Sequence, residues 1–330
     1  MIRPSIGRAW SHMRSLWPRW TLLPPAPWVL WCLYQFSRGV FRWDLIAALV
    51  LALTLSYTNQ STKRLLIGIY PACLVGVLYD SMKLFESVGV SKATVHLCDL
   101  RAHELAWFGF ESGGVRMTPG DWLQQHTSPV LDAISAIPYG TFIFVVLGYA
   151  VYLYFRDFTG LQRFAWAFLM LNVLGFITYH VYPAAPPWYF HSHGCVVDLA
   201  THASEGPGLT RVDAMLGFGY FHGMYGRSSD VFGAVPSLHS AYPLLLVLEG
   251  WRHNRWAAWF GMLAFAVTMW FAAVYLDHHW VTDVLLGIVY SALTYTATSL
   301  VFRYLKRRTE ANPLADRPLP VATGPGDTGA

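Results

Sequence analysis

The chain contains six apolar stretches of about the length that a helix needs to cross a lipid bilayer, roughly 20 residues. A shorter apolar stretch, 238–251, is a plausible seventh span beside these neighbours, and 24–42 is apolar but interrupted. Only 13% of the residues are charged, against about 25% in a soluble globular domain. The sequence therefore predicts an all-α fold, a polytopic integral membrane helical bundle of about six to eight spans. The six stretches are 44–60, 65–82, 133–155, 161–182, 256–276 and 280–302.

Basic residues gather at one set of ends of these spans, which orients the chain. By the positive-inside rule, these ends face the cytoplasm. The long segments 83–129 and 183–237 and the turn 277–279 are then expected on the extracytoplasmic side, of either an inner membrane or an endomembrane. The basic residues concerned are Lys63, Arg64, Arg156, Arg163, Arg252, Arg255 and the run from Arg303 to Arg308.

Three regions are expected along the chain. Residues 1–43 form a basic, aromatic arm and interfacial segment, which can lie on a membrane surface. Residues 44–302 form the transmembrane catalytic domain, and residues 303–330 a disordered cytoplasmic tail rich in Pro, Gly and Ala. The net charge of +4 is small and spread over segment ends, which argues against a nucleic-acid partner.

The four cysteines are too few and too scattered for a disulfide scaffold or a zinc site. Cys32 and Cys73 lie in apolar surroundings that suit packing. Cys98 and Cys195 fall in the two long polar segments and can pair if these face an oxidising compartment. The sequence leaves that pairing open.

The strongest chemical signal is a histidine with an aspartate four residues later, His279 and Asp283 in HHWVTDVLLG. On a helix these positions share a face. The carboxylate can then fix the tautomer of the imidazole and leave its other nitrogen nucleophilic. The alternative is an aspartate that caps a helix or belongs to a polar network at the membrane boundary.

A second histidine, His239 in GAVPSLHSAYP, is expected at the same membrane level. Pro236 suits the first turn of a helix, whose free amides and dipole attract an anion. A histidine beside that anion can act as a general acid and then as a general base. His239, His279 and Asp283 together predict phosphoryl transfer through a phosphohistidine, a chemistry that requires no metal and no cofactor.

GAVPSLHSAYP (233–243) and YLDHHWVTDVLLG (275–287) resemble the second and third signature motifs of the type 2 phosphatidic acid phosphatase superfamily. The resemblance implies that His279 is the nucleophile, that Asp283 supports it and that His239 protonates the leaving group. Two features depart from the usual pattern. The segment 272–275 lacks the Ser-Arg pair of the third motif, and YPAAPPWYF (182–190) stands where the first motif would carry its lysine and arginine.

These departures have a pattern of their own. The Tyr-Pro-x-x-Pro-Pro-Trp stretch, then Gly-Leu-x-Arg-Val-Asp (208–213), then Phe-Gly-Ala-x-Pro-Ser-Leu-His is similar to the inositol phosphorylceramide synthase branch of the superfamily, with all of these motifs inside 182–290. That resemblance implies transfer of a phosphoinositol head group from a phosphatidylinositol-like donor to a lipid alcohol. Ceramide is the acceptor that the branch implies, and a diacylglycerol-like acceptor is the alternative.

A phosphodiester still needs cationic or amide donors. Of the arginines, Arg227 is the first candidate and Arg211 the second, and Ser237 at the helix start is also expected to bind the phosphate. The alternative for either arginine is a salt bridge with Asp213 or Asp230 that orders the loop.

Two other functions remain open at this stage. The same residues would serve a lipid phosphate phosphatase, in which water attacks the phosphohistidine. The scarcity of arginines in the motifs favours a transferase, because a phosphodiester carries less charge than a phosphomonoester. A transporter or a non-catalytic scaffold is the third interpretation, and the sequence shows no internal repeat of the kind that many transporters have.

Overall fold

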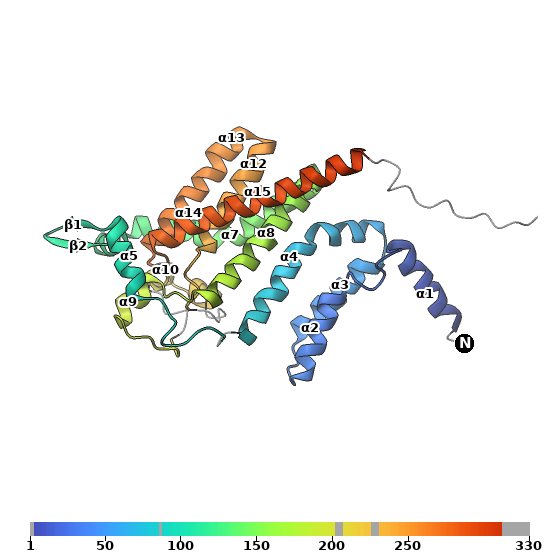
Figure 1. Ribbon diagram of the computed structural model, residues 1–330, viewed down its shortest axis with the longest axis horizontal. Coiled ribbons are helices and arrows are strands. Elements are labelled where there is room, and N and C mark those ends of the chain that lie inside the picture. Colours follow the sequence, from blue (N-terminus) through green and yellow to red (C-terminus); the bar gives the residue numbers. More distant parts are fainter. Residues whose placement is uncertain (1–2, 86–87, 202–206, 226–230, 312–330) are drawn as a thin grey trace, which may run out of the picture.

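The computed structural model describes residues 3–85, 88–201, 207–225 and 231–311, and these are helical apart from one short β-hairpin and the connecting loops. Figure 1 shows the long helices side by side, with the short elements gathered at one end of α14 and α15. The elements are α1 (Arg3–Leu16), α2 (Ala26–Ser37), α3 (Trp43–Tyr57), α4 (Gln60–Phe85), α5 (Cys98–Phe108), β1 (Phe110–Ser112), β2 (Val115–Met117), α6 (Pro119–Gln125), α7 (Pro129–Arg156), α8 (Phe158–Val181), α9 (Pro187–His193), α10 (Pro207–Leu216), α11 (Tyr220–Tyr225), α12 (Leu238–His253), α13 (Arg255–Ala257), the π-helical turn η2 (Ala258–Met262), α14 (Leu263–Tyr275) and α15 (Val281–Ala311).

Five helical segments within the described residues are long and apolar enough to cross a membrane. Two shorter helices, α3 of 15 residues and α12 of 16, correspond to two more of the predicted spans. The polytopic helical bundle is therefore confirmed, whereas the range of six to eight spans is supported only approximately. The five segments are Gln60–Met82, Pro129–Arg156, Phe158–Val181, Arg255–Tyr275 and Val281–Ala311.

The short helix α12 lies at the centre of the bundle, in contact with α7, α8, α14 and α15. Its start is hydrogen-bonded to α15, because the amide of Ser237 donates to the carbonyl of Asp283 (3.0 Å) and the hydroxyl of Ser240 to that of Val284 (3.1 Å). A Cβ at position 287 would lie 2.2 Å from the carbonyl oxygen of Ser237, so this close approach requires Gly287. The two predicted motifs are thereby fixed against one another.

The N-terminal helices α2 and α3 pack beside α4, on the outer side of the bundle (Figure 1). Asp80 of α4 links them, because its carboxylate accepts hydrogen bonds from Trp31 (3.1 Å) and Arg42 (2.7 Å). The helix α15 extends to Ala311, past the expected start of the tail at residue 303. The tail from residue 312 onward lies outside the described residues.

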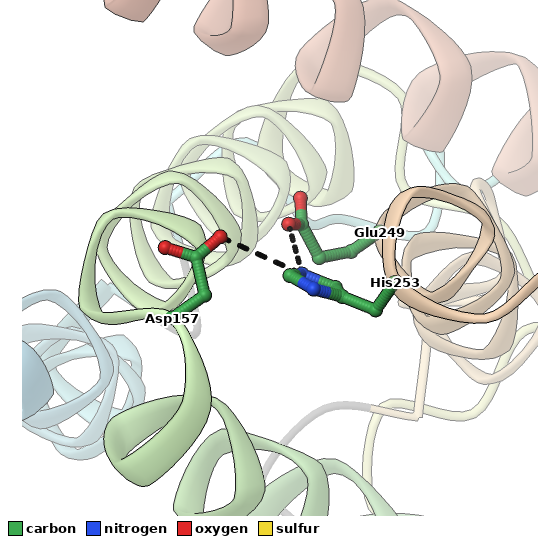
Figure 2. Close-up of side chains that lie close together, drawn as sticks. All are labelled: Asp157, Glu249 and His253. Carbon is green, nitrogen blue, oxygen red and sulfur yellow. Dashed lines mark hydrogen bonds and ion pairs between the residues drawn. The ribbon is translucent and has the colours of Figure 1, made fainter.

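A buried ionic cluster surrounds Glu249, and Figure 2 shows three of its side chains, Asp157, Glu249 and His253. Glu249 of α12 is 0% exposed and accepts hydrogen bonds from Arg163 of α8 (Nε to Oε2, 2.8 Å) and from the hydroxyl of Tyr295 (2.9 Å). His253 lies between Glu249 (3.3 Å) and Asp157 (3.7 Å). The cluster contains Arg163, one of the basic residues that the sequence assigned to the cytoplasmic ends.

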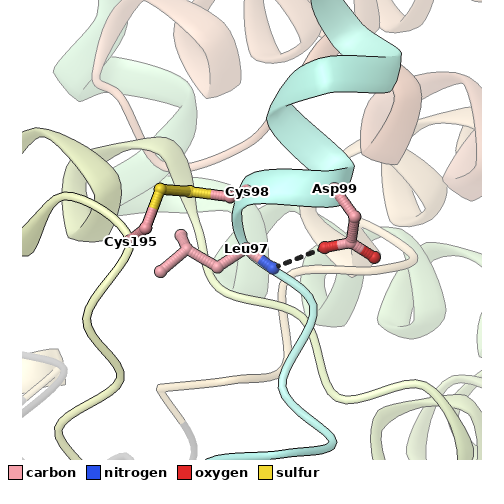
Figure 3. The surroundings of a disulfide bond; sticks show 4 residues. All are labelled: Leu97, Cys98, Asp99 and Cys195. Atoms are coloured by element: carbon pink, nitrogen blue, oxygen red, sulfur yellow. Dashed lines mark hydrogen bonds between the residues drawn. A yellow bond between two sulfur atoms is a disulfide. The ribbon is translucent and has the colours of Figure 1, made fainter.

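The described parts of the segments 83–129 and 183–237, which the sequence places between spans, form short helices and the β-hairpin at the opposite end. A disulfide between Cys98 and Cys195 joins the start of α5 to the segment after α9 (Figure 3). The pairing that the sequence left open is therefore formed. Three extended segments lie side by side near it, because Ala184 bridges both His96 and Gly233.

Candidate active site

The two predicted histidines meet where α12 and α15 begin. His239 is on the first turn of α12, and His279 lies in the turn before α15, 6% exposed. Their rings are joined by a hydrogen bond of 3.2 Å between His239 Nδ1 and His279 Nε2. Residues 40 positions apart in the sequence are thus brought into direct contact.

The backbone fixes the tautomer of His279. Its Nδ1 lies 3.1 Å from the carbonyl oxygen of Ala234, and a carbonyl only accepts, so Nδ1 carries the proton. Nε2 then presents its lone pair to His239, whose Nδ1 is the donor of the shared hydrogen bond. Burial lowers the pKa of His279 to about 4, so that its imidazole is neutral near pH 7. A neutral imidazole with an unprotonated Nε2 is the form required of a nucleophile.

Asp283 is 0% exposed and lies near this ring, but it does not make the closest contact with it. Its Oδ2 is 3.6 Å from His279 Nδ1, beyond hydrogen-bond distance, and accepts a hydrogen bond from the amide of Trp280 (3.0 Å). The reason is that α15 begins at Val281, so His279 precedes the helix rather than sharing a helical face with Asp283. In this structure the carboxylate acts as a helix-start acceptor with the imidazole close above it.

Sequence reasoning missed the aromatic residues around His239. Tyr139 of α7 is 0% exposed and stacks on the His239 ring at 4.7 Å, and Phe142 meets the same ring edge-on at 5.1 Å. These rings hold the imidazole in one orientation. Both belong to an ordinary apolar span, so no local signal in the sequence distinguishes them from lipid-facing residues.

Glu104 is a second residue that sequence reasoning did not find. Its carboxylate, 1% exposed, accepts hydrogen bonds from the amides of Val281 (2.8 Å) and Thr282 (3.2 Å) at the start of α15. It therefore caps this helix from α5, a favourable place for a negative charge. The disulfide at Cys98 holds the same helix α5 and so supports the position of the cap.

The turn 277–279, which carries His278 and His279, is linked to the neighbouring helices α9 and α6. Asp277 has a left-handed backbone (φ 65°) and its carboxylate contacts Nδ1 of His191 on α9 at 2.6 Å. The other nitrogen of His191 lies 2.8 Å from Asp121 of α6, which in turn makes two 2.9 Å hydrogen bonds with Arg101. Burial opposes a charge on His191, but the two carboxylates outweigh it and raise the pKa of His191 to about 9. His191 is thus a cation bridging two carboxylates.

The structure describes the contacts of two of the three predicted phosphate-binding residues. The hydroxyl of Ser237, 0% exposed, caps α12 by accepting from the amide of Ser240 (3.3 Å), and Pro236 precedes this cap instead of lying in the first turn. Arg211 of α10 donates to Asp132 and Gln124, both at 3.2 Å, rather than pairing with Asp213. Arg227 lies outside the described residues.

An apolar cavity of about 820 Å³ begins at the histidines, and its wall includes His239, His278 and His279. From there it extends between α4, α7 and α8, where side chains such as Met82, Val146 and Phe164 line it. Pockets of this size hold ligands of several hundred daltons with most of their surface buried. A polar reaction centre at the mouth of an apolar cavity suits a substrate with a charged head and a hydrocarbon body.

One group of side chains within the described residues could hold a metal ion, and it lies far from the histidine pair. The ligating atoms of Asp157, Glu249 and His253 are within 4.8 Å of one another (Figure 2). Arg163 already supplies a positive charge to Glu249, however, so the arrangement is that of a buried ion-pair network.

Comparison with known proteins identifies the family of this chain and several relatives of similar sequence. Residues 115–297, more than half of the chain, match the family model described as PAP2 superfamily. The phosphoinositol dihydroceramide synthase of Bacteroides thetaiotaomicron is 34% identical over 248 residues, which cover 74% of this chain and 79% of that protein. No solved structure shows a significant match.

Fungal proteins are similar over a shorter region. The inositol phosphorylceramide synthase of Candida albicans is 35% identical over 188 residues, 56% of this chain and 39% of that protein. The inositol phosphorylceramide synthase catalytic subunit of Saccharomyces cerevisiae is 34% identical over 192 residues, 56% of this chain and 45% of that protein. The chain therefore spans less than half of the length of these two fungal relatives.

Proposed function

The chain belongs to the PAP2 superfamily, and we propose that it is a membrane lipid phosphotransferase that works through a phosphohistidine at His279. The observation that carries the proposal is the hydrogen-bonded pair of His239 and His279 at the mouth of the apolar cavity. The pair supplies a nucleophile and a proton donor at one point, and the cavity gives a lipid access to both.

In the first step, Nε2 of His279 attacks the phosphorus of a bound phosphodiester and forms the N–P bond. The P–O bond to diacylglycerol breaks, and protonated His239 gives its proton to the departing oxygen. The anionic phosphodiester favours the protonated form of His239 in this complex. The phosphoryl group must first displace the hydrogen bond between the two rings, because their nitrogens are only 3.2 Å apart.

In the second step, the hydroxyl of an acceptor lipid gives its proton to His239. Its oxygen attacks phosphorus, the N–P bond breaks, and His279 returns to its neutral form. Tyr139 and Phe142 keep the His239 ring in place through both proton transfers. Ser237 and the arginines Arg211 and Arg227 remain the predicted donors to the phosphate.

The substrates follow from the relatives. Proteins named phosphoinositol dihydroceramide synthase and inositol phosphorylceramide synthase suggest a phosphatidylinositol-like donor and a ceramide-like acceptor. The uncharged segment from Ala272 to Tyr275 agrees with a phosphodiester donor, which carries less negative charge than a phosphomonoester.

The reaction is proposed to occur at the extracytoplasmic face. The histidine pair lies at the end of the bundle opposite the cluster of Arg163 and Glu249, and the positive-inside rule assigns that cluster to the cytoplasm. The disulfide of Cys98 and Cys195 next to the site agrees with an oxidising compartment.

The test uses the purified full chain with phosphatidylinositol labelled in its head group, with and without ceramide. We expect a labelled phosphoinositol ceramide that forms only when ceramide is present. His279→Gln should abolish it, while the matched control His180→Gln should retain it, because His180 contacts the carbonyl of Phe176 within its own helix. Release of free inositol phosphate alone would indicate a phosphatase, and full turnover by His279→Gln would refute the mechanism.

A further inference from the structure

The apolar cavity at the histidine pair is deeper than one leaflet of a bilayer. Along α8 its lining positions run from Tyr179, near the site, to Leu161, near the opposite end of the helix. At a rise of 1.5 Å per residue this distance is about 27 Å. One leaflet contributes only about 15 Å, half of the hydrocarbon thickness of a typical bilayer.

The helices α4, α7 and α8 form the walls of this groove. The helices α4 and α7 both pack against α8, which is the back wall between them. On α4 the lining positions include 68, 72, 75, 79 and 82, which recur every three or four residues and therefore lie on one face. This is the arrangement of a groove that runs parallel to the helices.

The groove is kept open in its deep half by small side chains. The lining face of α4 carries Tyr79 and Met82 near the histidines but Ala72 farther away. Ala150 of α7 and Ala165 of α8 also line it. The space that larger residues would occupy is left for a ligand.

We propose that this groove binds one hydrocarbon chain of the lipid substrate and that its depth makes the enzyme selective for long chains. The proposal rests on the proposed function, since that function brings the head of the lipid to His279. A chain that starts at the extracytoplasmic site then lies inside the protein past the middle of the membrane.

The selectivity has a packing origin. A chain that moves from bilayer hydrocarbon into an apolar groove gains no hydrophobic free energy, because both surroundings are apolar. A long chain fills the deep half and makes dispersion contacts there, whereas a short chain leaves that space without partner atoms. The deep residues should therefore affect long chains and leave short ones almost unaffected.

The first test narrows the deep half with Ala150→Trp. The matched control is Gly148→Trp, two residues away on α7 at an exposed position where an added Cβ meets nothing within 4 Å. Transfer is measured with stearoyl and octanoyl ceramide, and separately with distearoyl and dioctanoyl phosphatidylinositol, so that the two arms identify which lipid uses the groove. In one arm, Ala150→Trp should lower long-chain turnover about tenfold or more while short-chain turnover stays within about twofold.

Gly148→Trp should show the same turnover as the original protein with every lipid. Equal losses for long and short chains in both arms, or no loss in either, would overturn the inference.

The second test does not depend on turnover. The inactive variant His279→Gln is illuminated in nanodiscs with ceramide or phosphatidylinositol that carries a diazirine near the end of a stearoyl chain. Crosslinks should map to the deep lining positions around Ala72 and Ala165, and crosslinks confined to bilayer-facing positions would overturn the groove. If His279→Gln crosslinks at the deep positions but the original protein transfers no head group, the proposed function is refuted and the inference about the groove still holds.

Discussion

At the proposed catalytic pair, a backbone carbonyl contacts the imidazole of His279 more closely than the carboxylate of Asp283 does. His279 Nδ1 is 3.1 Å from the oxygen of Ala234 and 3.6 Å from Asp283. The sequence could indicate Asp283, because its spacing from His279 is regular. It could not indicate Ala234, because a carbonyl oxygen is present at every residue and only the folded chain selects one.

This geometry predicts a moderate effect for Asp283→Asn. The amide oxygen can still accept from Trp280, and the carbonyl of Ala234 still selects the reactive tautomer of His279. We therefore expect kcat to fall about 100-fold, less than the roughly 10⁴-fold loss seen when an amide replaces a carboxylate that alone fixes the tautomer. Steady-state transfer by the purified variant checks this, and a loss as complete as that of His279→Gln would show that the carboxylate is indispensable.

His191 makes a prediction about pH. Its pKa is raised from an ordinary value near 6.5 to about 9, so its bridging charge stabilises the folded protein fully below about pH 6.5 and less as the pH rises through about 9. In His191→Gln the stability of the turn should no longer depend on this titration. Thermal unfolding between pH 7 and pH 10, roughly the range spanned by the shift, should show a drop in Tm for the original protein and a flatter profile for the variant.

The matched control for that experiment is His193→Gln, since His193 contacts the carbonyl and the ring of Tyr189, within its own helix. If the drop in Tm at alkaline pH is unchanged in His191→Gln, the bridge to Asp121 and Asp277 does not stabilise the turn.

At the level of elements, the sequence predicts long helices well and short ones poorly. The stretch 133–155 corresponds to α7 and 161–182 to α8, because about 20 apolar residues are a strong signal. The short helix α9 was not expected, since 7 residues are too few to show a period and its packing is tertiary. The start of α15 at Val281 is likewise fixed by the carboxylate of Glu104, which is 177 positions away from it in the sequence.

The disulfide is predicted to stabilise the elements around the site. It links residues 97 positions apart and holds α5, whose Glu104 caps α15. Replacing both Cys98 and Cys195 by serine should cost about 2–4 kcal/mol of stability and lower Tm by several degrees. Cys73→Ser is the control for loss of an unpaired thiol. Dithiothreitol should lower the Tm of the original protein but not that of the double variant, and an equal response of the two would contradict the link.

At the end of the bundle opposite the histidines, replacing one charge of the ionic cluster should destabilise the protein more than replacing both charges. Glu249→Gln leaves the guanidinium of Arg163 without its carboxylate in a buried place, which costs about 3–5 kcal/mol. The double variant Arg163→Met/Glu249→Leu removes both charges and should be less destabilised than Glu249→Gln. Urea or thermal unfolding in detergent measures these variants and the single changes Arg163→Met and Glu249→Leu, and simple additivity of those two single changes in the double variant would refute the coupling.

For the whole molecule, the basic residues that the sequence assigned to one set of span ends lie together at one end of the folded bundle. The guanidinium of Arg64 lies 4.8 Å from the ring of Phe158, and Arg252 donates to Tyr295 (2.6 Å), so these cations gather at one end of the bundle. Sequence spacing alone could give this sorting, because helices that cross a membrane alternate direction. The depth of the apolar groove could not be foreseen, since it arises from the separation of α4 and α7 across α8.

The orientation itself gives the last prediction. Glu111 in the β-hairpin and Thr309 near the end of α15 are both exposed, at opposite ends of the molecule. With the active site on the extracytoplasmic side, Glu111→Cys should react with a membrane-impermeant maleimide in intact cells or sealed right-side-out vesicles. Thr309→Cys should react only after the membrane is permeabilised, because the positive-inside rule places the basic run from Arg303 to Arg308 on the cytoplasmic side. The original chain, whose described thiols other than the disulfide are Cys32 and Cys73, sets the background. Labelling in the reverse pattern would place the histidine pair on the cytoplasmic face and refute the proposed side of the reaction.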